Sequence, residues 1–425
     1  MPSPDGAARP HADLALEIGQ ALERLADTSP DRPAIIDDDG TLTVADLVTA
    51  AARRAQDFDS APGRLVDVAP FGRELIIGVL AVWLAAGIPR VSNQQQPCDR
   101  RARRLPHTCR PWLAGEARYG GGDRTVVLGG AAPLAPLTPA LRPGPGQVLL
   151  VSQRLRRLPV LHTVLRHLLD GGITVLVGRP RSPVSCWRQA VSRWPDAWAM
   201  PSAEHLDVLL TGPADAVAAG LRALMYTDLP SDTAALQRAV SARGSTRMLR
   251  VYDRLGYTCV QESAGLLQPV AGSRIRIVDA DGNVCGPGRT GTLEGTGAYD
   301  LTCHDITAPC PEPGTWHSVG DLGMVTAAGD LAWVDLGTAH RAVVDGTRVA
   351  FNRIFRAVRY HPAVVSCRVH AIPDDRRGHA IAVRALTTGH LDPEVLIDHC
   401  RRALPPEHQP ALITATAVRL PEARR

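Results

Sequence analysis

The feature that most constrains the fold is a regular alternation of helix-like and strand-like segments over the first half of the chain. Apolar residues recur at helical spacing over Leu14–Ala26, and the next stretch predicts a strand, a DG turn and a second strand. Thr43 is placed to cap a second helix, and a further helix is closed by Gly87. The pattern returns with a strand at Gln147–Ser152 and a helix at Leu158–Leu169. Such alternation is typical of an α/β domain.

Later segments depart from this alternation. Between Ser92 and Gly146 the residues are mostly Arg, Pro, Gly and Ala, so we expect loop there apart from a short strand at Arg124–Leu128. From Ser273 short strands with a DG turn predict a β-rich subdomain. The final segment predicts the order strand, helix (Arg353–Tyr360), strand, strand, helix (Pro393–Ala403), strand. We therefore expect a large N-terminal domain of αβ layers with a β-rich subdomain over residues 1–336, and a small α+β C-terminal domain over 337–425.

Composition narrows the classes of partner. The 425 residues include 47 basic and 43 acidic ones, with scattered arginines, which disfavours nucleic acid as a partner. No run approaches the ~20 apolar residues of a membrane-spanning helix, and the start of the chain lacks a signal sequence, so we expect a cytoplasmic protein without a membrane partner. The nine cysteines are widely spaced, as in proteins with reduced thiols. Cys303, His304 and Cys310 lack a nearby second ligand pair, and we expect no metal site.

Three ordered stretches carry a family resemblance. They are GTWHSVGDLGMVTAAGDLAWV at Gly314–Val334, the strand pair and DG turn from Ile275 to Tyr299, and HPAVVSCRVHAIPDDRRGHAIAVRAL at His361–Leu386. Each fragment alone is a common structural item, but their fixed order resembles the adenylate-forming ligases, the acyl-CoA synthetase family. The amino-terminal part agrees more loosely, through GVLAVWLAAG at Gly78–Gly87.

The resemblance implies a reaction and a set of ligands. Members of this family join a carboxylate to the α-phosphorus of ATP, release pyrophosphate and pass the acyl group to a thiol. ATP or AMP and CoA are the cofactors that it implies. The implied ligands are a small carboxylic acid, an acyl adenylate or an acyl thioester, and a carrier protein is a further possible partner. Charge builds on phosphate oxygens in such a reaction, so the site needs backbone amides, hydroxyl donors and a cation.

Nucleotide contacts are the first implied residues. Asp321, in what the sequence suggests is a GDLG turn, would accept hydrogen bonds from ribose hydroxyls, as a carboxylate can do for two neighbouring hydroxyls at once. The phosphate loop falls at Gly129–Pro136, where the hydroxyl residues and the lysine of the family are replaced. Gly129 and Gly130 could still offer backbone amides to an anion, whereas Pro133 and Pro136 have no N–H to donate.

The magnesium motif is altered as well. The family has an aromatic residue, Gly, any residue, Thr and Glu where this chain has Leu255–Cys259, so Gly256 and Thr258 are retained. Cys259 replaces the Glu, and a neutral thiol is a poor ligand for Mg²⁺. Glu262 is the candidate substitute, about 5 Å away if the segment is helical. Cys259 is either a candidate nucleophile or a small buried residue filling the vacated site.

Other family positions also differ. At the hinge, Gly337 and Thr338 replace an acidic or lysine residue and an arginine, and Arg341 is the nearby candidate to replace that arginine. A glycine pair that contacts pantetheine in the family appears as Gly346 and Thr347. The acyl-pocket histidine falls at the end of Gln153–Arg156, which leaves the substrate class open. The tail LPEARR stops short of the family's Gly-Lys, so we expect a truncated C-terminal domain.

These substitutions leave alternative functions. The favoured hypothesis is a ligase descendant that no longer adenylates and instead binds a ligand or partner, or performs chemistry without ATP. The alternative is an active carboxylic acid:CoA or carrier-protein ligase that forms an acyl adenylate, with Glu262 and Arg424 as replacements. A third, a nucleotide-dependent reductase or transferase with its phosphate loop at Gly120–Gly122, lacks the helix that should follow such a loop.

Overall fold

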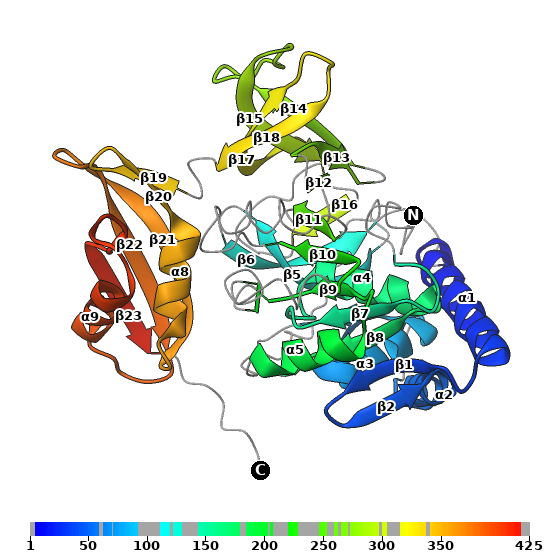
Figure 1. Cartoon of the computed structure of the whole chain (residues 1–425). Coiled ribbons are helices and arrows are strands. Elements are labelled where there is room, and N and C mark those ends of the chain that lie inside the picture. Colours follow the sequence, from blue (N-terminus) through cyan, green and yellow to red (C-terminus); the bar gives the residue numbers. More distant parts are fainter. Residues whose placement is uncertain are drawn as a thin grey trace. The chain divides into compact units, whose positions relative to one another are not determined.

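A computed structural model gives the fold of the chain (Figure 1). It describes residues 5–58, 63–69, 71–91, 111–119, 122–129, 143–178, 184–202, 205–206, 220–227, 246–252, 259–261, 265–270, 273–296, 300–303, 315–336 and 341–417. Two compact units are formed. The first comprises Met1–Thr227, Val240–Ile275 and Gly295–His317, and the second comprises Asp228–Ala239, Arg276–Glu294 and Ser318–Arg425. The domain boundary expected after residue 336 falls in 337–340, outside the described residues.

The first unit contains a nine-stranded sheet in the order β13-β12-β11-β10-β9-β7-β8-β1-β2 and a five-stranded sheet in the order β16-β6-β5-β4-β3. Its described elements are α1 (Asp5–Thr28), β1 (Pro33–Asp37), β2 (Gly40–Thr43), α2 (Val44–Ala55), β3 (Leu65–Asp67), α3 (Gly72–Leu84), β4 (Ile88–Arg90), β5 (Pro111–Tyr119), β6 (Gly122–Gly129), β7 (Val148–Val151), α4 (Leu158–Leu169), β8 (Ile173–Leu176), α5 (Val184–Arg193), β9 (Trp198–Met200), β10 (Ala223–Tyr226), β11 (Arg247–Tyr252), β12 (Cys259–Gln261), β13 (Leu267–Pro269) and β16 (Asp300–Cys303).

Local chemistry explains the helix boundaries in this unit. Thr43 caps α2 as predicted: its hydroxyl oxygen accepts the Asp46 N–H, and the Asp46 carboxylate accepts the Thr43 N–H, both at 3.1 Å. The end of α3 differs from the prediction. Ala86, with φ +56°, takes the left-handed position, and Gly87 follows it, donating its N–H to the Val82 carbonyl. A side chain at Gly87 would meet Val82 Cγ1 at 2.9 Å, so close packing requires the glycine.

The stretch expected to be loop contains a strand that the sequence did not reveal. β5 and β6 form an antiparallel hairpin in which Tyr119 pairs with Gly122 and Leu113 with Leu128. β5 also pairs with β4 on its other side. The strand 111–119 lacks regular apolar alternation and contains Pro111 and Gly115, so its extended form depends on pairing with both neighbours rather than on its own pattern. The expectation of loop for these residues was wrong.

The remaining strands and helices complete a β-rich sheet and the C-terminal segment. One four-stranded sheet has the order β14-β15-β17-β18, and the others are a two-stranded sheet, β19-β20, and a three-stranded sheet, β21-β22-β23. The described elements are β14 (Arg274–Val278), β15 (Thr290–Thr296), β17 (His317–Val325), β18 (Leu331–Leu336), β19 (Arg341–Val344), β20 (Thr347–Ala350), α8 (Phe351–Tyr360), β21 (Val364–Asp374), β22 (Gly378–Thr387), α9 (Pro393–Ala403), the 3₁₀ turn η2 (Pro406–His408) and β23 (Leu412–Ala417).

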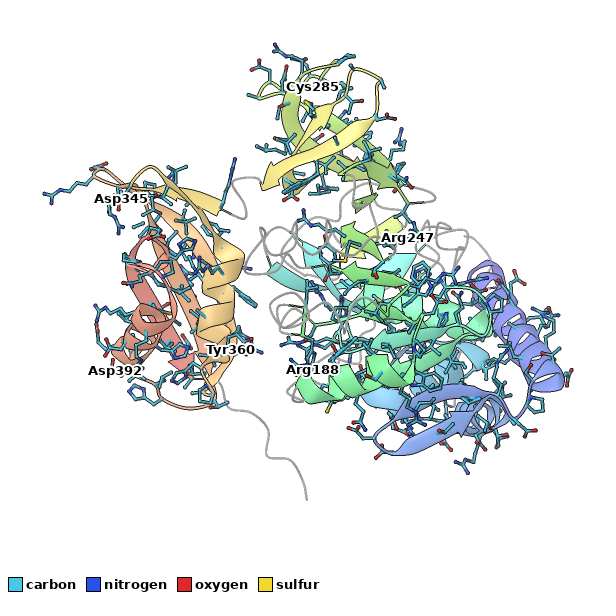
Figure 2. All side chains as sticks on the ribbon, viewed as in Figure 1. Arg188, Arg247, Cys285, Asp345, Tyr360 and Asp392 are labelled. Atoms are coloured by element: carbon cyan, nitrogen blue, oxygen red, sulfur yellow. The ribbon has the colours of Figure 1, made fainter. Side chains whose placement is uncertain are left out.

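The C-terminal segment follows the predicted order of elements closely. Helix α9 begins at Pro393 after Asp392, labelled in Figure 2, whose carboxylate accepts the Glu394 N–H at 3.0 Å. Buried Ile354 and Val358 of α8 and Leu396 of α9 pack in one apolar core with the central strand β22. The α/β fold class with a β-rich subdomain and a small α+β segment is confirmed. Among the described helices, none is both long and apolar enough to cross a membrane.

Candidate functional site

The nine-stranded sheet reverses its strand order between β7 and β9. From β7 the chain passes through α4 to β8 on one side, then through α5 to β9 on the other side of β7, and β10 and β11 continue in that direction. The pairings β7–β8, β7–β9, β9–β10 and β10–β11 are all parallel. Open parallel sheets bind ligands outside the carboxyl ends of the strands at such a reversal. The residues that follow β7, β9 and β10 are therefore the first candidates for a site.

A buried polar network joins the carboxyl ends of β7 and β9. The Ser152 hydroxyl lies 2.9 Å from His205 Nδ1, and Ser202 Oγ lies 2.9 Å from the same nitrogen. Trp187 of α5 donates its indole N–H to Ser152 Oγ at 3.1 Å, and the Ser202 backbone N–H donates to that oxygen at 2.9 Å. The network ties both strand ends to α5. Its side chains from Ser152, Trp187 and His205 are all buried.

Counting hydrogen bonds distinguishes this network from a nucleophile and its base. A serine hydroxyl has one proton to donate and two lone pairs to accept with. Both acceptor positions of Ser152 are used, by Trp187 and by the Ser202 N–H, so its proton is the group left for His205 Nδ1. That nitrogen lies equally close to Ser202 Oγ, and its role toward the Ser202 hydroxyl depends on the tautomer of the ring. Both lone pairs of Ser152 are engaged by donors, and we interpret the network as structural.

A guanidinium crosses the same edge of the sheet. Arg157 lies at the N-terminal boundary of α4, and its NH1 donates to Thr227 Oγ1, just after β10, at 3.0 Å. Since β9 lies between β7 and β10, this side chain spans the carboxyl end of β9, over a strand separation of roughly 10 Å. Next to Thr227, burial raises the pKa of Tyr226 to about 12, while the positive charge of Arg250 on β11 acts in the opposite direction. Tyr226 is therefore a neutral hydroxyl at physiological pH.

A second buried polar pair lies in the four-stranded sheet. Asp321 of β17 is 1% exposed, in a row with buried Val319 and Val325 on one face of the strand. Its Oδ2 accepts the indole N–H of Trp333 on β18 at 3.0 Å. Trp333 pairs in register with Gly323, where a side chain would meet Ile277 Cδ1 at 2.8 Å. The expected GDLG turn is therefore a strand, whose glycine packs closely against Ile277 and the Ala332 carbonyl.

Comparison with known proteins gives a structural answer. No family model matches the sequence, and no curated protein does. Among solved structures, o-succinylbenzoate CoA synthetase from Bacillus subtilis, in complex with its acyl-adenylate intermediate, is similar with a TM-score of 0.59 and 15% identity, covering 93% of this chain and 94% of that one. ATP-bound MatB from Rhodopseudomonas palustris is similar with a TM-score of 0.62 and 14% identity, covering 94% of this chain and 95% of that one. The amide bond synthetase McbA from Marinactinospora thermotolerans is similar with a TM-score of 0.55 and 16% identity, covering 94% of this chain and 96% of that one.

The chain has the fold of the adenylate-forming ligases. At these identities the likeness concerns the fold, and it confirms the architecture that the sequence resemblance implied. Within the adenylate-forming fold the predicted site residues are only partly described. Gly130, Gly256, Thr258 and Glu262 lie outside the described residues. Gly129 is the last residue of β6, where it pairs with Pro111 of β5 and Asp300 of β16.

The segment that carries Cys259 is a strand. Cys259 begins β12, opposite Tyr252 of β11 and Pro269 of β13. Cys259–Gln261 are extended rather than helical. Glu262 itself lies outside the described residues, so its role as a substitute ligand stays a prediction.

The C-terminal candidates lie in the β19–β20 hairpin. Arg341 is the first residue of β19 and pairs with Ala350. The glycine pair was predicted at Gly346 and Thr347, but Thr347 is already the first residue of β20, paired with Val344. The two turn residues are Asp345 and Gly346, with φ of +50° and +79°, as a two-residue turn with both angles positive requires. Gly346 therefore lies in the turn and Thr347 in the strand that follows it, and their contact with a ligand stays a prediction.

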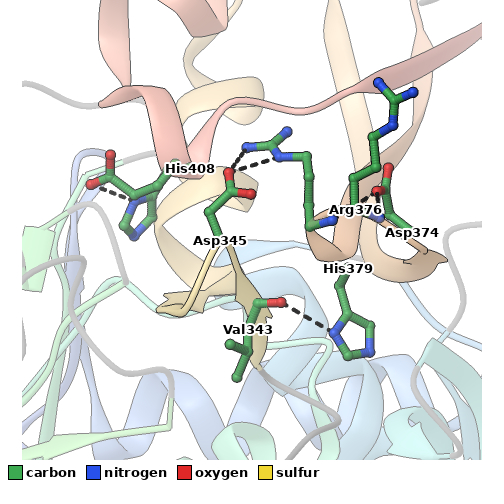
Figure 3. Close-up of polar contacts among 8 residues, drawn as sticks. Val343, Asp345, Asp374, Arg376, His379 and His408 are labelled. Carbon is green, nitrogen blue, oxygen red and sulfur yellow. Dashed lines mark hydrogen bonds and ion pairs between the residues drawn. The ribbon is translucent and has the colours of Figure 1, made fainter.

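This hairpin is fixed to the turn between β21 and β22 (Figure 3). The Asp345 carboxylate accepts from Arg377 Nε at 2.8 Å, and the Asp345 N–H donates to the Arg377 carbonyl at 3.0 Å. His379 Nδ1 lies 3.2 Å from the Val343 carbonyl. A side chain at Gly378 would come within 3.4 Å of that carbonyl oxygen. The β19–β20 turn is therefore fixed to the β21–β22 turn by several hydrogen bonds.

Sequence reasoning missed the polar residues that the structure brings together. Ser152, Ser202 and His205 are separated by up to 53 positions and form no local pattern, so only the sheet order reveals their contact. The contact between Asp321 and Trp333 could have been predicted from the sequence, since the two residues flank a predicted hairpin and can meet across it. Among the described residues, no three His, Cys, Asp or Glu side chains gather as they would around a metal ion.

Proposed function

We propose that this chain uses the adenylate-forming fold to bind a small carboxylic acid or its thioester without forming an acyl adenylate. The observation that carries the proposal is the state of Asp321. This carboxylate, which the family resemblance assigns to the ribose, is 1% exposed and accepts the Trp333 indole N–H at 3.0 Å. A carboxylate with one indole donor keeps further acceptor positions, so it is the burial of Asp321, rather than the indole bond alone, that opposes contact with a ribose hydroxyl.

The sequence supports the same proposal at two further positions. The phosphate loop Gly129–Pro136 has neither hydroxyl side chains nor a lysine, and Cys259 stands where the family has the magnesium ligand. Removing one preorganised donor from a transition-state site costs about 10²–10³ in rate. The residues present do not fit magnesium ATP, so we derive no adenylation step. Losses within one site are not additive, so the reduction in rate from several replacements is not the product of the single ones.

The carboxyl edge of the nine-stranded sheet supports a ligand there. The reversal of strand order between β7 and β9 creates the kind of position at which open α/β sheets bind ligands. Arg157 reaches across this edge to Thr227 at 3.0 Å and supplies positive charge close to it. One of the similar structures carries an acyl-derived ligand, since o-succinylbenzoate CoA synthetase holds an acyl adenylate. We extend the acyl part of that ligand class to this chain, without the nucleotide.

Calorimetric titration of the purified chain with ATP, with and without Mg²⁺, tests the proposal. MatB from Rhodopseudomonas palustris, whose structure is ATP-bound, serves as the positive control under the same buffer. We expect binding of ATP to the control and none to this chain at millimolar nucleotide. Pyrophosphate release is measured in parallel with a panel of carboxylic acids. Magnesium-dependent ATP binding, or pyrophosphate above the no-enzyme background, contradicts the proposal.

A further inference from the structure

Ser152 and Gln153 both follow β7, but their side chains differ in how far their hydrogen-bonding groups are paired. The backbone N–H groups of both residues donate to the Met200 carbonyl, at 3.1 Å for Ser152 and 3.3 Å for Gln153. The segment after β7 is therefore fixed against the end of β9. The Ser152 hydroxyl is fully used within its network. Gln153 is 9% exposed, yet its side-chain oxygen Oε1 is buried and accepts no hydrogen bond from the residues that the structure describes.

A buried amide oxygen without a donor requires a reason. Nearly all buried polar atoms in folded proteins have a partner, and leaving one unpaired costs stability. A leucine of similar size would fill the same space without that cost. Gln153 lies directly after the strand at which the sheet order reverses, which is the position for ligand contacts in open α/β sheets. A ligand bound at this position could supply the missing donor.

We propose that Gln153 is a specificity-determining residue whose Oε1 accepts a hydrogen bond from a hydroxyl or N–H on the acyl part of the ligand. This inference rests on the proposed function and specifies its ligand class: a carboxylic acid or thioester that carries a hydrogen-bond donor along its chain or ring. An unsubstituted acyl group would leave Oε1 buried and unpaired in the complex too, so it binds more weakly.

Gln147, on the same segment, gives a matched control. It lies at the amino end of β7, and its Oε1 accepts the Gly144 N–H at 2.8 Å and the Trp198 indole N–H at 3.0 Å. Gln147→Leu should lower the melting temperature, because two donors lose their acceptor, and should leave ligand preference unchanged. Gln153→Leu should leave the melting temperature unchanged or raise it. A purely structural role for Gln153 predicts that both variants are destabilised.

Ligand preference is measured on wild type and both variants with matched acids that differ by one hydroxyl. The probes are butyrate with 2-, 3- and 4-hydroxybutyrate, and benzoate with 2-, 3- and 4-hydroxybenzoate, titrated by ligand-observed NMR. For wild type and Gln147→Leu we expect at least one hydroxy acid to bind about tenfold more tightly than its parent, the value of one good hydrogen bond. Gln153→Leu should reduce that ratio to about one by removing this bond.

The outcomes separate this inference from the proposed function. Equal binding of parent and hydroxy acids overturns the role of Gln153 and leaves the proposed function standing, and so does a loss of melting temperature in Gln153→Leu as large as in Gln147→Leu. Failure of every acid to bind the wild type overturns the proposed ligand class itself, together with the inference that rests on it.

Discussion

Buried Trp187 and half-buried Trp333 both donate an indole N–H to a buried side-chain oxygen, in different surroundings. Trp187 gives its indole N–H to the Ser152 hydroxyl at the edge of the nine-stranded sheet, and Trp333 gives its N–H to the Asp321 carboxylate in the four-stranded sheet. The Ser152 hydroxyl is a neutral acceptor, and its partners are an indole, a backbone N–H and the imidazole of His205. The Asp321 carboxylate can carry a full charge on an otherwise apolar face. A neutral network can be completed by hydroxyls and backbone, whereas a buried carboxylate needs strong donors to remain ionised.

The neutrality of the first region extends to helix α4. Burial lowers the pKa of His162 to about 3, with the charge of Arg166 adding to the effect. Burial likewise lowers the pKa of His167 to about 4, although the Ile173 carbonyl, which accepts from its Nε2 at 3.2 Å, acts in the opposite direction. The ring of His167 occupies the space that a side chain at Gly172 would need. Both imidazoles are therefore held neutral inside the fold.

The largest expected effect that tests this comparison is acid sensitivity. His162 and His167 have pKa values below the ordinary 6.5 in the folded chain, so the unfolded chain binds their protons first as pH falls. Stability is complete above about pH 6.5 and is lost below it, until each folded pKa is reached. From pH 7 to pH 5 the two groups together should remove about 4 kcal/mol of unfolding free energy. Urea unfolding at several pH values measures this loss.

Two variants sharpen that measurement. His162→Leu should remove about half of the pH dependence, and His167→Leu about the other half. Hydrogen exchange then compares the two regions within one molecule. Protection factors should fall between pH 7 and pH 5 in residues 158–169, and fall less in 317–336. Equal losses in both stretches would remove the distinction drawn between them.

The next effect concerns the closed network itself. Ser152→Ala leaves the Trp187 and Ser202 N–H groups without their acceptor and His205 Nδ1 without this donor. We expect a loss of about 3 kcal/mol in unfolding free energy, because unpaired buried donors carry their full desolvation cost. Ser192→Ala, at an exposed position of α5, is the matched control and should change stability by less than about 0.5 kcal/mol. A neutral Ser152→Ala would show that the network is not needed for the fold.

Strong local signals allowed the C-terminal segment to be predicted well. The predicted helix Pro393–Ala403 has the observed bounds, and the helix predicted from Arg353 begins two residues earlier at Phe351. Asp392 with Pro393 is a capping pair that sequence alone reveals. The apolar periodicity of α8 also agrees with its buried face. Here local propensity and tertiary packing favour the same structure, so little is left to context.

Elsewhere the sequence was insufficient because the deciding contacts are distant in the chain. Strand β5 exists through its neighbours β4 and β6, and its own pattern was interpreted as loop. Gly323 was interpreted as part of a turn, although it lies in a strand and packs closely against Ile277 and the Ala332 carbonyl. For the site, the resemblance indicated Asp321, but neither its burial nor its indole partner. The contrast between Ser152 and Gln153 depends on hydrogen-bond counts that need coordinates.

The smallest expected effect tests the second tryptophan. Trp333→Phe keeps an aromatic ring but removes the N–H that donates to Asp321, and we expect a loss of about 2 kcal/mol in unfolding free energy. Asp321→Asn removes the charge and keeps an acceptor oxygen, so it should change stability by less than about 1 kcal/mol. In the double variant the tryptophan replacement should cost less than in the wild type, because the lost hydrogen bond then involves a neutral amide.

The cycle of these two substitutions measures the coupling between the indole and the carboxylate, and chemical denaturation of all four proteins gives it directly. A coupling near 1–2 kcal/mol is expected for a charge-assisted hydrogen bond. Additive effects would mean that Asp321 does not depend on Trp333 and remains available to another donor such as a ribose hydroxyl. That result would weaken the observation on which the proposed function rests. It would also mean that Trp333 contributes to stability through packing rather than through its hydrogen bond to Asp321.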